Sequence, residues 1–81
     1  MKPTVEDIYN RITPIFRELF DDPSITPNDE MTAEQVPAWD SLSHVSLVVA
    51  LESEFSIRFS ISELQDLKNV GNLVQLIQNK L

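Results

Sequence analysis

The sequence predicts an all-α fold, a small four-helix bundle with three long helices, a short third helix and a long loop between helices one and two. Apolar residues recur at spacings of three and four in several segments, which is typical of amphipathic helices. No two segments alternate between apolar and polar residues in a way that predicts paired strands. A chain of 81 residues buries only a thin core, so we expect residues 1–81 to form a single domain.

The first helix is expected over about residues 4–20. Thr4 and Asp7 resemble a capping box, with aspartate in place of the usual glutamate. Pro14 lies inside the pattern and has no amide hydrogen, so we expect a kink there or a restart with Thr13 as the cap. The apolar face consists of Val5, Ile8, Ile12, Ile15, Phe16 and Leu19.

Residues 21–40 are expected to form a long loop, because they contain three prolines and show no sustained apolar period. Loops of this length in a small domain are often functional. Thr32 and Gln35 predict one helical turn within the loop. The residues expected to pin the loop to the helices are Ile25, Met31, Val36 and Trp39. Four acidic residues lack the spacing and the glycine of a calcium-binding loop, so we expect them to be solvated; they are Asp21, Asp22, Asp29 and Glu30.

The second helix is expected from Ser41 to about Ser56 and carries two apolar stripes. At about 100° per residue, one stripe is an ordinary core face; it consists of Leu47, Val48, Leu51 and Phe55. The other is centred about 120° away, with Ser41 between the two; it consists of Leu42, Val45 and Val49. Because so small a domain rarely buries two faces of one helix, we expect the second stripe to be a surface docking patch. The alternative is that both stripes are buried, one against the first helix and the other beneath the loop.

The remaining residues predict two more helices. The stretch SIRFS is expected to be extended. Ser60 and Glu63 predict a capping box for a short third helix over residues 61–67. Asn69 is expected to cap a fourth helix over residues 70–81. The inward-facing residues of that helix are Val70, Leu73, Val74 and Ile77.

The composition argues against several classes of function. The absence of cysteine excludes disulfides and thiolate sites, and a single histidine excludes a histidine-rich metal site. The net charge of -7 disfavours nucleic acid and anionic lipid as partners, and it favours a monomer and a partner with a basic docking face. No segment approaches the roughly 20 apolar residues of a membrane span, and the first residues lack the apolar core of a signal peptide. We therefore expect a cytoplasmic protein that does not bind membranes.

Ser41 is the strongest candidate functional residue, because it lies where the loop becomes the second helix. Asp40 can cap that helix, so a serine is not needed there for capping. Free amides and the helix dipole would favour a phosphate on Ser41. His44 lies one turn further, where it either approaches such a phosphate or packs at the edge of the core. A hydrolase using Ser41 and His44 would lack a glycine-flanked nucleophile elbow, and no enzyme activity is expected.

The stretch DSLSHVSLVVALESEF, residues 40–55, resembles the second helix of the acyl carrier proteins, to which the peptidyl carriers are related. The triplet Asp40-Ser41-Leu42 is similar to their attachment site for 4'-phosphopantetheine. The resemblance extends over the first helix, the long loop and the last two helices.

The resemblance implies that a phosphopantetheinyl transferase moves the arm from coenzyme A to Ser41, and that the thiol of the arm holds acyl groups as thioesters. Asp40 would flank the site and cap the helix. Enzymes that load or transfer acyl groups would contact Leu42, Val45, Val49 and Ile61. The short third helix would influence whether the cargo is sheltered between helices.

The sequence departs from many fatty-acid carriers in its charge pattern. Their second helix is typically acidic along its exposed side, whereas the comparable positions Ser43, Ser46 and Ser53 are neutral. Nine of the 13 carboxylates lie in residues 1–40. This pattern favours polyketide or other specialised acyl metabolism over housekeeping fatty acid biosynthesis. The alternatives are a peptidyl or aminoacyl carrier, or an unmodified helical adaptor that docks through the second stripe.

Overall fold

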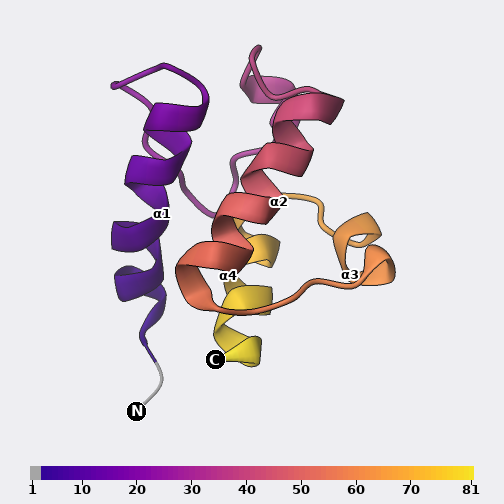
Figure 1. Cartoon of the computed structure of the whole chain (residues 1–81). Helices are drawn as coiled ribbons and strands as arrows, with labels where there is room; N and C mark the ends of the chain where they lie inside the picture. The colour runs from indigo at the N-terminus through magenta and orange to yellow at the C-terminus, as the bar shows by residue number, and fades with distance from the viewer. Residues whose placement is uncertain (1–2) are drawn as a thin grey trace.

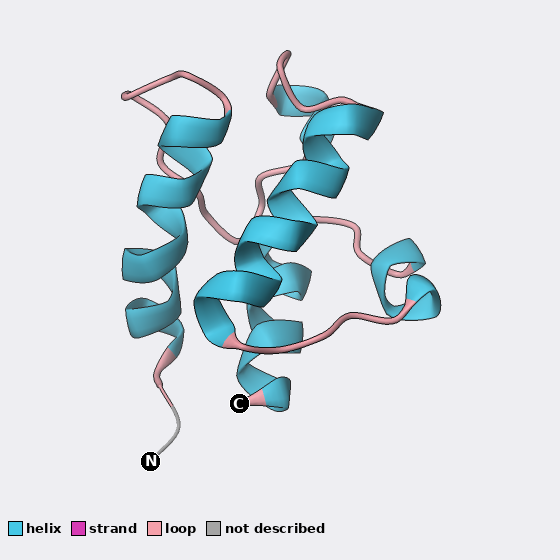
Figure 2. Cartoon of the chain, in the orientation of Figure 1, coloured by secondary structure: helices cyan, strands magenta, loops and turns pink. Residues whose placement is uncertain are grey.

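The structure is a computed structural model that describes residues 3–81 and contains only helices and loops in that range. Helix α1 spans Val5–Leu19, α2 spans Ser41–Phe55, α3 spans Ile61–Gln65 and α4 spans Val70–Lys80, with a 3₁₀ turn, η1, at Ala33–Gln35. Helix α1 packs against both α2 and α4, and the short α3 stands apart beside α2 (Figure 1). The long loop joins α1 to α2 (Figure 2). The predicted all-α bundle with its helical turn in the loop is therefore confirmed.

Helix α1 begins with the predicted capping box. The Asp7 amide donates to Thr4 Oγ1 at 3.1 Å, and the Thr4 amide donates to Asp7 Oδ2 at 3.2 Å. The helix continues through Pro14, so the alternative of a restart capped by Thr13 is wrong. Thr13 Oγ1 instead donates to the Tyr9 carbonyl at 2.7 Å. Pro14 leaves one carbonyl of the preceding turn without a helical donor, but this face of α1 is exposed, so water can solvate that carbonyl.

The core lies between α1, α2 and α4. Its fully buried large side chains are Ile8, Ile12, Phe16, Leu47, Leu51, Val70, Val74 and Ile77. The loop contributes the buried Ile25 and Val36, and the half-buried Met31 and Trp39 pack against the same core. The four predicted loop anchors are therefore confirmed.

The loop also binds the start of α4 through its backbone. The Val70 amide donates to the Met31 carbonyl at 2.8 Å, and the Gly71 amide donates to the Asp29 carbonyl at 3.1 Å. These bonds satisfy two amides that the first turn of a helix leaves free. A Cβ atom on Gly71 would lie 2.9 Å from the Asp29 carbonyl oxygen, so the close approach requires glycine. The Tyr9 hydroxyl donates to the Asp29 carboxylate, which ties the same part of the loop to α1.

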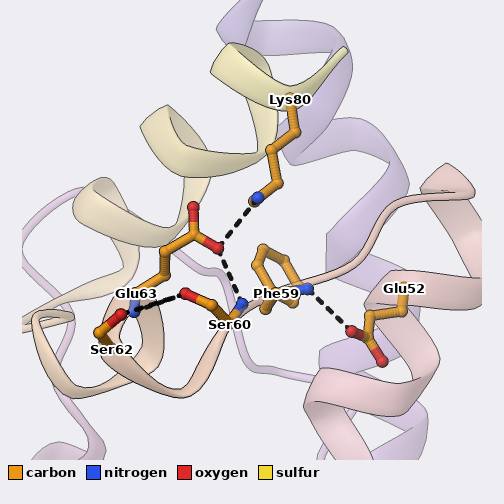
Figure 3. A network of polar contacts seen from close by, with 6 residues as sticks. All are labelled: Glu52, Phe59, Ser60, Ser62, Glu63 and Lys80. Carbon is orange, nitrogen blue, oxygen red and sulfur yellow. Dashed lines mark hydrogen bonds and ion pairs between the residues drawn. The ribbon is translucent and has the colours of Figure 1, made fainter.

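Helix α3 is held by polar contacts rather than by burial (Figure 3). It ends two residues earlier than predicted, and none of its side chains is buried. The Ser60 amide donates to Glu63 Oε1 at 2.8 Å and the Glu63 amide donates to Ser60 Oγ at 3.1 Å, which confirms the predicted capping box. Glu63 Oε1 also lies 2.9 Å from Lys80 Nζ of α4. The Phe59 amide, just before α3, donates to Glu52 Oε2 of α2 at 2.9 Å.

Candidate functional site

The first turn of α2 is fixed by Asp40. Its Oδ1 atom accepts hydrogen bonds from the amides of Leu42 at 3.1 Å and Ser43 at 2.9 Å, so the expectation that Asp40 caps the helix is confirmed. The bond from the Ser43 amide, followed by the Ser43 hydroxyl, lowers the pKa of the Asp40 carboxyl, because both donors favour its charged form. The expectation of free amides at this end is wrong for Leu42 and Ser43, whose amides bind the carboxylate.

Ser43 completes this cap. Its Oγ atom accepts from the Asp40 amide at 2.8 Å, and it also lies 2.8 Å from the Ala38 carbonyl, to which it can donate. The side chain is half-buried against the loop. The assignment of Ser43 to the neutral exposed side of the helix is therefore wrong, whereas Ser46 and Ser53 are exposed as expected. A serine three residues after a capping aspartate was the signal that could have predicted this role.

Ser41 is the first residue of α2, and it is exposed. Within residues 3–81, its hydroxyl takes part in no side-chain hydrogen bond. The cap is complete with Asp40 and Ser43 alone, so the Ser41 oxygen can form a new covalent bond without loss of a structural contact. An exposed hydroxyl at a rigid helix start fits a phosphate ester that points into solvent.

His44 packs at the edge of the core, which was one of the two positions expected for it. Its Nδ1 atom accepts a hydrogen bond from Trp39 Nε1 at 3.2 Å, and the two rings stack at an angle of 21°. Trp39 in turn meets Phe16 edge to face, with 5.6 Å between ring centroids. As an acceptor, Nδ1 carries no proton in this arrangement. The bond between Trp39 and His44 could not be predicted, because no sequence motif relates residues five positions apart across a helix start.

The apolar stripe, defined as Leu42, Val45 and Val49, lies on the surface. These side chains are 82%, 61% and 58% exposed. Ile61 of α3 is 76% exposed. The expectation of an exposed second face is confirmed, and the alternative that both faces are buried is wrong. The physical reason is that the loop packs on the core and α4, whereas Leu47, Leu51 and Phe55 fill the buried face of α2.

Across the described part of the chain, no three histidine, aspartate or glutamate side chains gather as a metal ligand set. No described helix is both long and apolar enough to cross a membrane.

Comparisons with known proteins agree on one family. A family profile described as "Phosphopantetheine attachment site" matches residues 4–77. An acyl carrier protein of Acidothermus cellulolyticus is 34% identical over 74 residues, which cover 91% of this chain and 88% of that protein. An acyl carrier protein homolog of Mycoplasma genitalium is 48% identical over 42 residues, which span 52% of this chain and only 50% of that protein. The solution structure of a holo acyl carrier protein from Geobacter metallireducens has a TM-score of 0.85 and 50% identity, covering 89% of this chain and 83% of that one.

Proposed function

The chain belongs to the acyl carrier proteins, and from that premise we propose that Ser41 is the residue on which it carries its 4'-phosphopantetheine. The observation that carries the proposal is the exposed Ser41 hydroxyl, which is free of hydrogen bonds within residues 3–81 and lies beside a cap made by other residues. The family consists of carriers and not of catalysts. When bound, the arm supplies a thiol that holds acyl groups as thioesters.

The residues around Ser41 present its oxygen to a separate transferase. Asp40 and Ser43 fix the first turn of α2, so the backbone position of Ser41 is set before the enzyme arrives. The Asp40 carboxylate remains ionised because the amides of Leu42 and Ser43 donate to it. An ionised carboxylate next to the hydroxyl can help to hold a metal ion that the transferase brings. Ser41 itself needs no activation by His44, whose Nδ1 is bonded to Trp39.

The test is the intact mass of the purified protein before and after incubation with coenzyme A, Mg²⁺ and a broad-specificity phosphopantetheinyl transferase. We expect the mass of one arm to be added to the parent and to Ser46→Ala, and nothing to be added to Ser41→Ala. Ser46 is a matched control, because it is an exposed serine on the same helix. A parent that stays unmodified while a known carrier is modified in the same tube would contradict the proposal and favour the unmodified adaptor.

The partners follow from the position of the arm. They are the phosphopantetheinyl transferase and the enzymes that load and transfer acyl groups, which we propose to contact Leu42, Val45, Val49 and Ile61. Exposure of all four apolar side chains around the start of α2 and on α3 supports this assignment. We propose that the protein acts as a single-domain monomer in the cytoplasm, with the net charge of -7 supporting the monomer.

The cargo is proposed to belong to polyketide or other specialised acyl metabolism. The support is the exposed side of α2, where Ser46 and Ser53 stand in place of acidic residues. Isolation of the protein from its own cells, followed by release and mass analysis of the thioester-bound group, tests the proposal. Oxygenated or branched acyl groups would agree with it, whereas a series of plain saturated fatty acyl groups would refute it, and an aminoacyl group would indicate the peptidyl class.

A further inference from the structure

The exposed groups near Ser41 determine the chemistry of a partner surface, on the premise that the arm is attached to Ser41 as proposed. We propose that an enzyme acting at Ser41 docks on the apolar stripe by apolar contact and places a carboxylate against Arg58, at the far end of that stripe. The enzyme would therefore present an apolar rim with an acidic group, rather than a basic patch.

The stripe starts next to Ser41 and extends away from it along α2. Leu42, Val45 and Val49 follow one another at spacings of three and four, so they lie on one helix face over about 10 Å. All three are more than half exposed. An enzyme whose active site reaches the oxygen of Ser41 must come close to this face. Burial of exposed valine and leucine side chains is favourable, so the stripe can supply docking energy.

The carboxylates of α2 are already engaged within the protein. Glu52 Oε2 accepts from the Phe59 amide at 2.9 Å, and the Glu52 side chain is largely buried. Glu54 Oε2 lies 3.5 Å from a terminal nitrogen of Arg11, whose guanidinium also covers the Phe55 ring. Each carboxylate of α2 therefore already has a donor or a cation within the protein. None of them is left free to bind a basic group on a partner.

A hollow with a volume of about 500 Å³ lies at the far end of the stripe. It is lined by Val49, Glu52, Ser53, Ser56, Ile57 and Arg58. The Arg58 side chain is 91% exposed, and its Nη1 atom is 3.8 Å from Glu52 Oε1, which is beyond hydrogen-bond distance. Since Glu52 is held by the Phe59 amide, Arg58 retains donors for an external group. A guanidinium binds a carboxylate with two parallel hydrogen bonds, so a carboxylate is the group that suits the exposed Arg58 side chain, on the side facing away from Glu52.

The net charge of -7 does not contradict this assignment. A net negative charge steers a protein toward positive surfaces over distances of about 10 Å. Docking itself is decided by the groups that touch, and here those groups are an apolar stripe and a cation. Opposite charges that meet at such a rim mainly raise the association rate and select the partner.

The test is the rate of arm transfer to the apo-protein by a broad-specificity phosphopantetheinyl transferase, since that enzyme must reach Ser41. The quantity measured is kcat/KM with the carrier as the varied substrate, in the presence of coenzyme A and Mg²⁺. We expect Val49→Asp to lower kcat/KM at least about tenfold, and Arg58→Glu to lower it about fivefold or more. Lys68→Glu is the matched control, because it makes the same charge change at an exposed residue outside the hollow, and it should stay within about twofold of the parent.

Thermal melts and circular dichroism of each variant establish that α2 is intact before rates are compared. Rates for Val49→Asp and Arg58→Glu equal to the parent would overturn the inference and leave Ser41 as the attachment site. A fall in the parent's kcat/KM of about a hundredfold between 0.05 and 0.5 M NaCl would also overturn it, because salt does not screen apolar contact and a single ion pair at Arg58 accounts for only about a fivefold effect. An unmodified parent would instead contradict the proposed function, so the two failures are distinguishable.

Discussion

Asp40 and Ser43 cap each other across the first turn of α2. The Ser43 amide donates to Asp40 Oδ1 at 2.9 Å, and the Asp40 amide donates to Ser43 Oγ at 2.8 Å. Ser41 lies between these two residues and takes no part in the cap. The residues that cap the start of α2 are therefore different from the residue proposed to carry the arm. Helix stability and modification can be tested independently.

Ser43→Ala should destabilise the protein without preventing modification. The substitution removes the acceptor of the Asp40 amide and the contact to the Ala38 carbonyl, and we expect the free energy of unfolding to fall by about 1 kcal/mol. Urea unfolding measures this change. Ser46→Ala, on the exposed side, is the control and should change stability by less than about 0.5 kcal/mol. Equal stability of the two variants would mean that the reciprocal cap contributes nothing.

The same cap makes stability depend on acid pH. The pKa of Asp40 is lowered in the folded protein, first by the Ser43 amide. Its contribution to stability is therefore fully present above the unfolded pKa of about 3.9 and is lost as pH falls through the folded pKa. Titration of the Asp40 carboxyl by NMR should give a midpoint below that of an ordinary aspartate. A midpoint at or above the ordinary value would contradict the observed geometry.

Most of the fold could be predicted from the sequence, because its signals are local. The capping pairs Thr4 with Asp7 and Ser60 with Glu63 both formed, since a cap depends only on residues three positions apart. The apolar period of α4 gave its buried face. Pro14 was the exception, because α1 continues through it. The buried side chains of Ile12 and Phe16, on either side of Pro14, hold the helix against the core despite the missing hydrogen bond.

The candidate site was predictable only in part. Exposure of the apolar stripe followed from the angle between two helix faces. The bond between Trp39 and His44 and the position of Arg58 at a hollow depend on how the loop and the segment after α2 fold back, which no local pattern encodes. The role of Ser43 was not predicted, because its exposure was inferred from the comparable positions of the carrier family and not from its spacing of three residues from Asp40.

Gly71→Ala should detach the loop from α4. Alanine gains about 1 kcal/mol of helix propensity, but its Cβ would meet the Asp29 backbone at 2.9 Å, and such overpacking costs about 1–3 kcal/mol. We expect a net loss of about 1 kcal/mol and faster exchange of the residue 71 amide. Gln75→Ala, exposed on the same helix, is the control. A Gly71→Ala variant more stable than the parent would contradict the prediction, because it would show that the loop at Asp29 can move away from the added Cβ without a loss of stability.

The phenol of Tyr9 should keep its proton to unusually high pH. Burial raises its pKa, and the hydrogen bond to Asp29 with the charge of that carboxylate raises it further. This contribution to stability is complete below the unfolded pKa of about 10 and is lost as pH rises toward the folded pKa. Because Tyr9 is the only tyrosine, phenolate absorbance reports it alone. Asp29→Asn should lower the midpoint, and a parent that titrates near 10 would contradict the contact.

Lys80→Ala should loosen α3 while leaving the rest of the bundle unchanged. Lys80 Nζ lies 2.9 Å from Glu63 Oε1, and α3 has no buried side chain to hold it when that pair is removed. Segments with few apolar contacts open at low free-energy cost, so amide exchange in residues 61–65 should accelerate several-fold. Exchange in α2 should not change, because its core residues Leu47 and Leu51 do not depend on α3.

The control for this prediction is Lys68→Ala, which removes an exposed lysine that makes no ion pair within residues 3–81. Hydrogen exchange measured by NMR separates the two helices residue by residue. If Lys68→Ala accelerated α3 as much as Lys80→Ala, the effect would come from net charge rather than from the pair with Glu63. Ile61 lies on α3 and is exposed. If Lys80→Ala alone loosens α3, we therefore expect weaker contact with enzymes that approach Ser41, while modification of Ser41 still goes to completion.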